Sequence, residues 1–185
     1  MDKNSTSQEL VKNKFGACEN FATSASGEYV ATLADGNLNF FYRGNVIGNF
    51  PKPGLLARKM AFSPDGKYLS IIDKKTLYLF ETKTGKLLWQ YMLDKPELSF
   101  VSLDVTGNAT QIIVGVDFDK GKKEAPGDRH TNGFIYLLDK SGKTIWTKEL
   151  TYKLWGVNFP KVLFSSDGTK FSVITREKIY LFTGN

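Results

Sequence analysis

A turn that contains glycine recurs four times along this chain of 185 residues, each time followed by alternating apolar strands. The four copies are Ser24-Ala25-Ser26-Gly27, Ser63-Pro64-Asp65-Gly66, Asp104-Val105-Thr106-Gly107 and Ser165-Ser166-Asp167-Gly168. Their glycines lie 39, 41 and 61 residues apart, and the last interval falls to about 44 when a polar insertion of about 17 residues before Phe134 is set aside. A period near 40 residues indicates a repeat architecture built from small sheets.

The units agree internally as well. Thirteen residues after three of the glycines come Phe40, Leu79 and Leu181, each in the middle of an apolar strand. A second glycine turn precedes Trp89 and Trp146 at the same distance, so we expect both tryptophans to pack between neighbouring sheets. One four-stranded sheet cannot bury both of its faces, whereas sheets packed radially cover each other. The pattern therefore predicts an all-β propeller of one domain, with four recognisable four-stranded blades at about residues 15–50, 55–93, 98–150 and 156–185.

Two runs resemble known repeat families. The run from Ser63 to Ser70 resembles the corner between the first two strands of WD-repeat propellers, and the run from Thr84 to Trp89 resembles the tryptophan-docking turn of quinoprotein-type (PQQ-like) propellers. The resemblance covers residues 15–185 and implies a propeller fold. It also implies two classes of function, since these families include both non-catalytic scaffolds and enzymes that bind a redox cofactor. The adjacent cysteine pair of quinone-binding dehydrogenases is absent from the sequence.

The two ends of the chain are in phase with each other. Unit four stops before its outermost strand, and residues 7–13, with Leu10 and Val11, occupy the place of an outer strand ahead of unit one. We therefore expect residues 8–13 to form a strand against residues 178–183 and close the last blade. Two alternatives stay open: a fragment of a longer propeller, and half of an eight-bladed ring made by two chains, in which case the protein is a homo-oligomer.

The repeat is lengthened in two places, at residues 117–133 and 151–161, and both are expected on the same face of the propeller. This face would bind a protein partner without chemistry, and the net charge of +6 favours an acidic one. The competing interpretation is a solvated insertion. The candidate partner-binding residues are Lys120, Lys122, Lys123, Arg129, His130, Tyr152, Lys153 and Trp155.

Other chemistries have little support in the sequence. One cysteine and one histidine exclude a cysteine metal cage and most zinc sites, and the pattern Asp117-x-Asp119-x-Gly121 with Glu124 only partly fits a calcium loop, so no metal or cofactor is expected. Cys18 is predicted to be a small apolar filler. No apolar run is long enough to span a bilayer, and no nucleic-acid motif is present. The lack of a leader favours the cytoplasm, while an exported mature form would also fit.

The runner-up function is a PQQ-like propeller enzyme or redox-cofactor binder. Such a protein needs a pocket on the ring axis that is lined by charged groups from several blades. The candidates near the ends of the repeat strands are Asp73, Glu81, Asp139 and Glu177.

Overall fold

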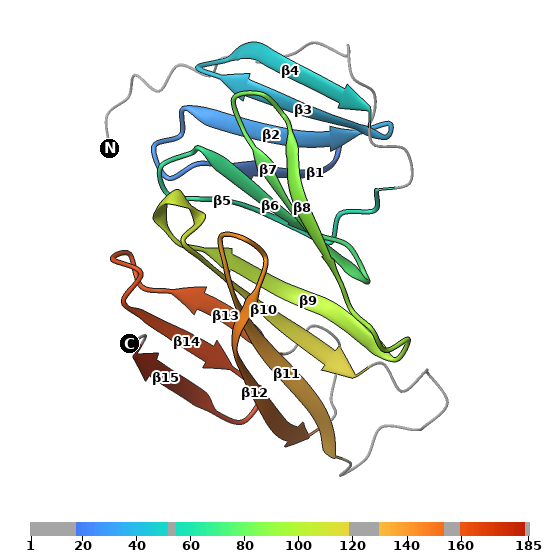
Figure 1. Ribbon diagram of the computed structural model, residues 1–185, viewed down its shortest axis with the longest axis vertical. Helices are drawn as coiled ribbons and strands as arrows, with labels where there is room; N and C mark the ends of the chain where they lie inside the picture. Colours follow the sequence, from blue (N-terminus) through green and yellow to red (C-terminus); the bar gives the residue numbers. More distant parts are fainter. Residues whose placement is uncertain (1–17, 52–54, 119–129, 154–159, 184–185) are drawn as a thin grey trace, which may run out of the picture.

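The computed structural model describes residues 18–51, 55–118, 130–153 and 160–183. These residues form strands and one short 3₁₀ helix, which confirms the all-β prediction. Four antiparallel sheets follow one another down the long axis of the molecule, and we call them blade 1 to blade 4 in chain order (Figure 1). Blades 1 to 3 contain four strands each, and the described part of blade 4 contains three.

Strand order within each blade is the order of the sequence, so every blade is a simple up-and-down meander. Blade 1 contains β1 (Cys18–Thr23), β2 (Tyr29–Ala34), β3 (Asn37–Tyr42) and β4 (Asn45–Pro51). Blade 2 contains β5 (Lys59–Phe62), β6 (Tyr68–Ile72), β7 (Thr76–Glu81) and β8 (Leu87–Met92). Blade 3 contains β9 (Leu98–Val105), the helix η1 (Gly107–Ala109), β10 (Gln111–Phe118), β11 (His130–Asp139) and β12 (Thr144–Lys153). Blade 4 contains β13 (Lys161–Phe164), β14 (Lys170–Ile174) and β15 (Ile179–Thr183).

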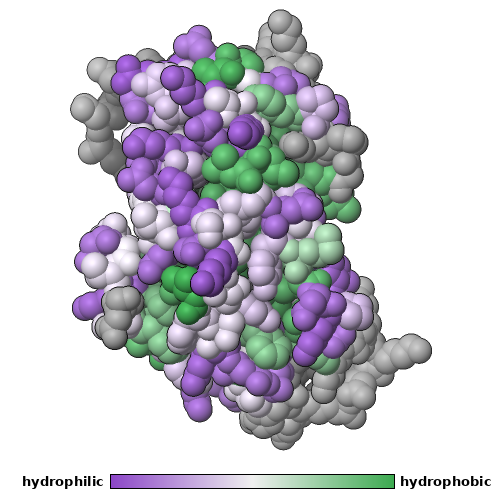
Figure 2. Space-filling view, in the orientation of Figure 1, coloured by the Kyte–Doolittle hydropathy of each residue, from purple (hydrophilic) through white to green (hydrophobic). Residues whose placement is uncertain are grey.

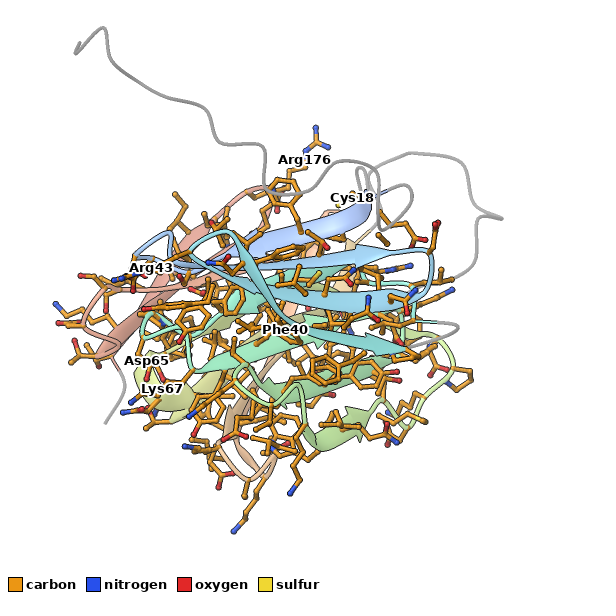
Figure 3. The ribbon with its side chains drawn as sticks, turned by 90° about the horizontal axis from the view of Figure 1, so that it is seen from above. Cys18, Phe40, Arg43, Asp65, Lys67 and Arg176 are labelled. Atoms are coloured by element: carbon orange, nitrogen blue, oxygen red, sulfur yellow. The ribbon has the colours of Figure 1, made fainter. Side chains whose placement is uncertain are left out.

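Successive blades contact each other chiefly through their first strands, which makes β1, β5, β9 and β13 the inner strands of the arrangement. Alternate residues of each blade face the blade before it and the blade after it. Leu79 of blade 2 packs with Leu103 and Val114 of blade 3, whereas Phe80 packs with blade 1. Figure 3 shows Phe40 inside the stack of sheets. The core is therefore three layers of mainly apolar side chains between four sheets, with a few buried polar residues such as Ser70 and Ser102.

The turn after each inner strand has the same hydrogen bonds in all four blades. A serine or threonine hydroxyl accepts a bond from the backbone N–H five residues later, at 2.9 to 3.1 Å. The backbone N–H three residues after the hydroxyl residue donates to its carbonyl, and that donor has a positive φ, which glycine adopts without strain. The donors are Gly27, Gly66, Ala109 and Gly168.

Blade 3 therefore departs from the predicted repeat register. The sequence analysis took Gly107 as its repeat glycine, but the residue at that structural position is Ala109, with φ of 50°. The hydroxyl residue of this turn is Thr106, and Gly107 is the residue after it. The prediction is wrong by two residues, because a glycine inside the turn was taken for the glycine that ends it.

Aromatic side chains of the outer strands join each blade to the next, which confirms the prediction for the two tryptophans. The Trp89 indole of β8 donates to the carbonyl of Lys140 in blade 3 at 2.8 Å, and a Cβ on Gly142 would lie only 2.9 Å from this indole. Trp146 of β12 makes edge contacts with Phe171 and Phe182 of blade 4, with ring centroids 5.6 and 5.4 Å apart.

Blade 1 uses a phenylalanine for the same purpose, which the sequence analysis did not predict. By its spacing from the turn glycine Gly44, Gly48 takes the place that Trp89 and Trp146 have in blades 2 and 3. In the structure Gly48 does pair with Phe40, as Trp89 pairs with Leu79, but the ring of Phe50 folds back over Gly48. The same ring lies against Gly85 of blade 2, where a Cβ would collide with it.

Two further expectations concern the first residues of the chain and the last strand. Cys18 is exposed at the start of β1, so the prediction that it fills apolar space is wrong (Figure 3). The predicted closing strand at residues 8–13 lies outside the described residues. Among those described, β15 pairs with β14 alone, and its other edge has no strand beside it.

Candidate interaction surface

The blades have two ends, set by the direction of the strands. The tight turns after the inner strands lie at the left in Figure 1, and we call this the turn end. The opposite end, which we call the loop end, carries the ends of β10 and β12 and the starts of β5, β9, β11 and β13. Both lengthened segments of the sequence therefore begin and end at the loop end.

Blade 3 extends farther toward the loop end than the other blades. Strands β11 and β12 are ten residues long, whereas β6, β7 and β8 have five or six residues each. The ladder between β11 and β12 continues to the pair His130 and Lys153. The start and the end of the predicted insertion thus belong to regular strands, because Asp117 pairs with Gly133.

A buried tyrosine holds the base of this extension. The Tyr152 hydroxyl donates a hydrogen bond to Asp117 Oδ1 at 2.8 Å, and its ring packs under β11, where a Cβ on Gly133 would lie 2.8 Å from it. Burial, together with the negative charge of Asp117, raises the pKa of Tyr152 far above its ordinary value. Only 4% of Tyr152 is exposed, so this residue packs within the blade. We therefore leave it out of the candidate contact surface.

The other predicted partner-binding residues are placed only in part. His130 and Lys153 belong to the ends of β11 and β12, opposite each other in the ladder. Lys120, Lys122, Lys123, Arg129 and Trp155 lie outside the described residues. The ladder thus brings residues 130 and 153 together, as the sequence analysis expected for two segments of one face.

The connections at the loop end are held by cationic side chains. Lys75 Nζ donates to the carbonyls of Lys95, Pro96 and Leu98 and so fixes the chain between β8 and β9. Arg58 donates to the carbonyl of Phe100 at 3.2 Å, which links blade 2 to blade 3. Charges of both signs occupy the described part of this end, with Lys59, Lys74, Lys95 and Lys161 beside Asp73, Asp94, Glu97 and Asp117.

Three charged side chains come together on adjacent inner strands: Lys59 of β5, Asp104 of β9 and Lys161 of β13. Asp104 Oδ2 accepts a bond from the backbone N–H of Phe164 at 2.7 Å, so it fastens blade 3 to blade 4. Burial raises the pKa of Asp104, against the bond from Phe164 and the nearby charge of Lys59. Burial lowers the pKa of Lys59, while Asp104 acts in the opposite direction.

The sequence analysis missed this group for a definable reason. Asp104 stands at the structural position of Ala22, Ala61 and Leu163 on the other inner strands. An aspartate at a position that is otherwise apolar is a recognisable signal. The two-residue register error placed Asp104 in the turn, where an acidic or hydroxyl residue is ordinary, and so concealed it.

The acidic residues proposed for an axial pocket do not come together. Asp73 accepts bonds from the N–H groups of Lys75 and Thr76 and caps the turn of its own hairpin. Asp139 caps the turn of blade 3 in the same way, and the Ser141 hydroxyl that donates to it lowers its pKa. Glu81 accepts a bond from Thr84 within blade 2, and Glu177 is exposed in blade 4.

An open hollow of about 630 Å³ lies where the turns of all four blades converge, and we call it the turn-end hollow. Its lining includes Ala25, Pro64, Thr106, Ser166 and Asp167, with Phe21, Phe62 and Phe164 deeper on the inner strands. The outline of the molecule in Figure 2 is indented at the left edge, on the side of these turns. The Ser165 hydroxyl lowers the pKa of Asp167 to about 2, so the rim of the hollow carries a fixed negative charge.

The described ranges contain neither a cluster of metal-binding side chains nor a membrane-spanning helix. They contain no group of three or more histidine, cysteine, aspartate or glutamate side chains that could hold a metal ion. Of the residues that partly fit a calcium loop, Asp117 accepts a hydrogen bond from Tyr152, and Asp119, Gly121 and Glu124 lie outside these ranges. No helix in the same ranges is long and apolar enough to cross a membrane.

Comparison with known proteins gives a structural likeness alone. No family model and no curated protein matches the sequence. The chain is similar to U3-55K, a solved WD40 β-propeller protein, with a TM-score of 0.59 and 16% sequence identity. The match covers 95% of this chain and 54% of that one, so the chain spans about half the length of the propeller it resembles. The likeness shows that the blades are arranged as in a β-propeller.

Proposed function

We propose that the protein is a non-catalytic β-propeller module that binds a protein partner through the loop end of blade 3. The binding surface comprises residues 117–133 and 151–161 without the buried Tyr152. One observation carries the proposal. Blade 3 is longer than the other blades because β11 and β12 continue as a paired ladder as far as His130 and Lys153. A longer paired hairpin fixes the two strand ends between which the insertion runs, which lowers the entropy that a partner must overcome.

The rest of the structure supports a platform for binding. Neighbouring blades are joined by Trp89, Trp146 and Phe50 at their outer strands and by Arg58 and Asp104 at their inner strands. Binding segments are commonly borne by loops on such rigid scaffolds. Because charges of both signs occupy the described loop end, we assign the predicted preference for an acidic partner to Lys120, Lys122 and Lys123 of the insertion.

The experiment compares three variants with the parent chain. In the first, Phe118 is joined to Asn132 through Asn-Gly, because the last described pair of β10 and β11 is Asp117 with Gly133 and a two-residue turn suits the next pair. In the second, Lys120, Lys122 and Lys123 become glutamate. The control is Ser166→Arg, which fills part of the turn-end hollow and leaves the loop end unchanged. Each protein is immobilised and its bound partners are identified by mass spectrometry.

The proposal expects the shortened chain to melt at the parent temperature and to lose the partners, while the Ser166→Arg chain keeps them. The lysine variant should lose partners with acidic surfaces. If the shortened chain keeps every partner and Ser166→Arg loses them, the turn-end hollow is the binding surface and the proposal is wrong.

A redox-cofactor binder is the second candidate, and one observation favours it. Lys59, Asp104 and Lys161 place charged groups from three blades on adjacent inner strands, as an axial cofactor site would require. Asp104 is already engaged by the N–H of Phe164, which limits what it can offer a ligand. Protein purified from its native source decides between the two, because a bound quinone absorbs in the near ultraviolet and visible and a scaffold does not.

A further inference from the structure

One sheet face of blade 4 corresponds to the face by which blades 1, 2 and 3 each pack on the next blade. In those three blades this face is buried. In blade 2, Ala61, Ser70 and Leu79 lie side by side across three strands, with Ile72 paired to Leu77. In blade 4 the same places are taken by Leu163, Ser172 and Leu181, with Ile174 paired to Ile179. The two faces match position for position, and in blade 2 this face packs against blade 3.

Exposure separates the two faces. Leu77 and Leu79 of blade 2 are completely buried, whereas Ile179 and Leu181 of blade 4 are 75% and 69% exposed. Leu163 and Ile174 are exposed as well. The equivalent face is also buried in blade 1 around Phe40 and in blade 3 around Leu137. Contiguous apolar side chains at an exposed sheet face mark an interaction site.

Blade 1 offers the matching surface at the other end of the arc. Phe21 of β1 occupies the position of Met60, Leu103 and Val162, which face the preceding blade and are at most 6% exposed. Phe21 itself is 68% exposed. Val46 is exposed on the same face, because it pairs with Phe41, which pairs in turn with Val30. Asn39 and Phe41 on this face are buried, so the exposed part is the strip that contains Phe21 and Val46, and a preceding blade would pack there.

The structural match covers 95% of this chain and 54% of the propeller chain, with a TM-score of 0.59, so the four blades correspond to about half of such a chain. A second copy of this chain brings four more blades and a second pair of the same exposed faces. A head-to-tail contact that closes after two copies gives a ring with twofold symmetry, in which both junctions are identical.

We propose that two copies of this chain form an eight-bladed ring, in which blade 4 of each copy packs on blade 1 of the other through Leu163, Ile179 and Leu181 on one side and Phe21 on the other. Thr23 and Thr32 lie beside Phe21, so the junction is less apolar than the internal ones. The dimer should consequently depend on concentration. The inference is independent of the proposed function, since the junction uses sheet faces of blades 1 and 4, whereas the proposed binding surface lies at the loop end and, apart from Lys161, outside these two blades.

The first test is the mass in solution by sedimentation over a range of concentrations. The parent should reach twice the 20.7 kDa of one chain. Leu181→Asp and Phe21→Asp should each weaken association at least about tenfold, because each places a charge in an apolar junction. Met92→Asp is the matched control, since Met92 is equally exposed on an outer strand of blade 2 and should leave association unchanged.

The second test places the junction itself. Asp104 of blade 3 meets Phe164 of blade 4, and the equivalent pair across the proposed junction is Leu163 with Thr23. Leu163→Cys and Thr23→Cys are combined with Cys18→Ser, and a short bismaleimide is added. A cross-link between two chains supports the ring.

Three results would overturn the inference. A mass of one chain at every concentration excludes the dimer. A cross-link within one chain shows that the four blades close on themselves. If neither Leu181→Asp nor Phe21→Asp weakens association, or if association continues beyond two chains, the copies meet through a different contact.

Discussion

The indole nitrogen of Trp89 donates a hydrogen bond to the main-chain carbonyl of Lys140, 2.8 Å away and 51 positions later in the chain. The bond joins the outer strand of blade 2 to a turn of blade 3. Lys140 in turn lies with its ammonium 4.1 Å from the centre of the Tyr68 ring, so two aromatic residues of blade 2 hold the same turn. Contacts of this kind keep the blades at a fixed angle to each other.

Truncating either repeat tryptophan should destabilise the protein. Trp89→Ala and Trp146→Ala are each expected to lower the free energy of unfolding by roughly 3–5 kcal/mol, as for other large aromatic truncations. Trp89→Phe is the control, because it retains ring contact with Gly142 and loses only the bond to Lys140. Urea unfolding measures all three, and alanine variants as stable as the parent would refute the blade packing.

The glycines beneath the aromatic side chains should resist substitution more than other turn glycines. Gly27 and Gly85 both have positive φ, which costs an alanine roughly 1–2 kcal/mol. A Cβ on Gly27 meets nothing within 4 Å, whereas a Cβ on Gly85 collides with the Phe50 ring. Gly85→Ala should therefore cost about 1–3 kcal/mol more than Gly27→Ala. Equal losses in thermal unfolding would mean that Phe50 does not pack on blade 2.

The partly buried carboxylate of Asp104 should make stability depend on pH. Its pKa in the folded state is raised above the ordinary value of 3.8, so the folded protein binds this proton more tightly than the unfolded chain. The contribution of this group to stability is therefore lost as pH rises from about 3.8 through the folded-state pKa. Asp104→Asn should remove this decline, which is measured as the difference in unfolding free energy between the two proteins from pH 4 to 7.

Asp104→Ala provides the contrast. It removes the charge and also the acceptor for the N–H of Phe164, which an asparagine oxygen can still satisfy. An unpaired N–H at the junction of blades 3 and 4 should cost about 1–3 kcal/mol. If the alanine and asparagine variants are equally stable, the bond to Phe164 does not hold the blades together.

Removal of residues 1–14 tests the predicted closing strand. Among the described residues β15 has one unpaired edge, and the exposed side chains of Ile179 and Leu181 lie next to it. A strand at residues 8–13 would cover that edge, from the second copy in the proposed ring or from the same chain if the four blades close on themselves, so the deletion should lower stability by about 2–4 kcal/mol. An unchanged melting temperature would dismiss this strand.

The sequence predicted the repeat well where its signal was local. Turns built on a hydroxyl residue and glycine, and strands with alternating apolar residues, depend on neighbours in the chain, and blades 1, 2 and 4 follow the predicted spacing. Blade 3 does not, because Ala109 adopts a conformation that the pattern reserved for glycine. As a result, the sequence analysis placed Asp104 in a turn, although this residue lies on the inner strand β9.

Relations between blades were harder to predict, because they depend on contacts far apart in the chain. Phe50 replaces a tryptophan by folding back over Gly48, and nothing in the spacing of the repeats distinguishes it from its neighbours. Tyr152 looked like a surface aromatic because it stands in a long polar connection. It is buried because β12 continues as a strand as far as Lys153, which the sequence analysis did not anticipate.

The affinity of the purified partner for three forms of the chain is the most direct measure of the proposed binding surface. Titration calorimetry compares the parent, the chain with Phe118 joined to Asn132 through Asn-Gly, and Ser166→Arg. Shortening the loop should raise the dissociation constant at least about tenfold, equal to about 1.4 kcal/mol, while Ser166→Arg leaves it unchanged. Equal dissociation constants for the parent and the shortened chain would contradict binding through the loop end of blade 3.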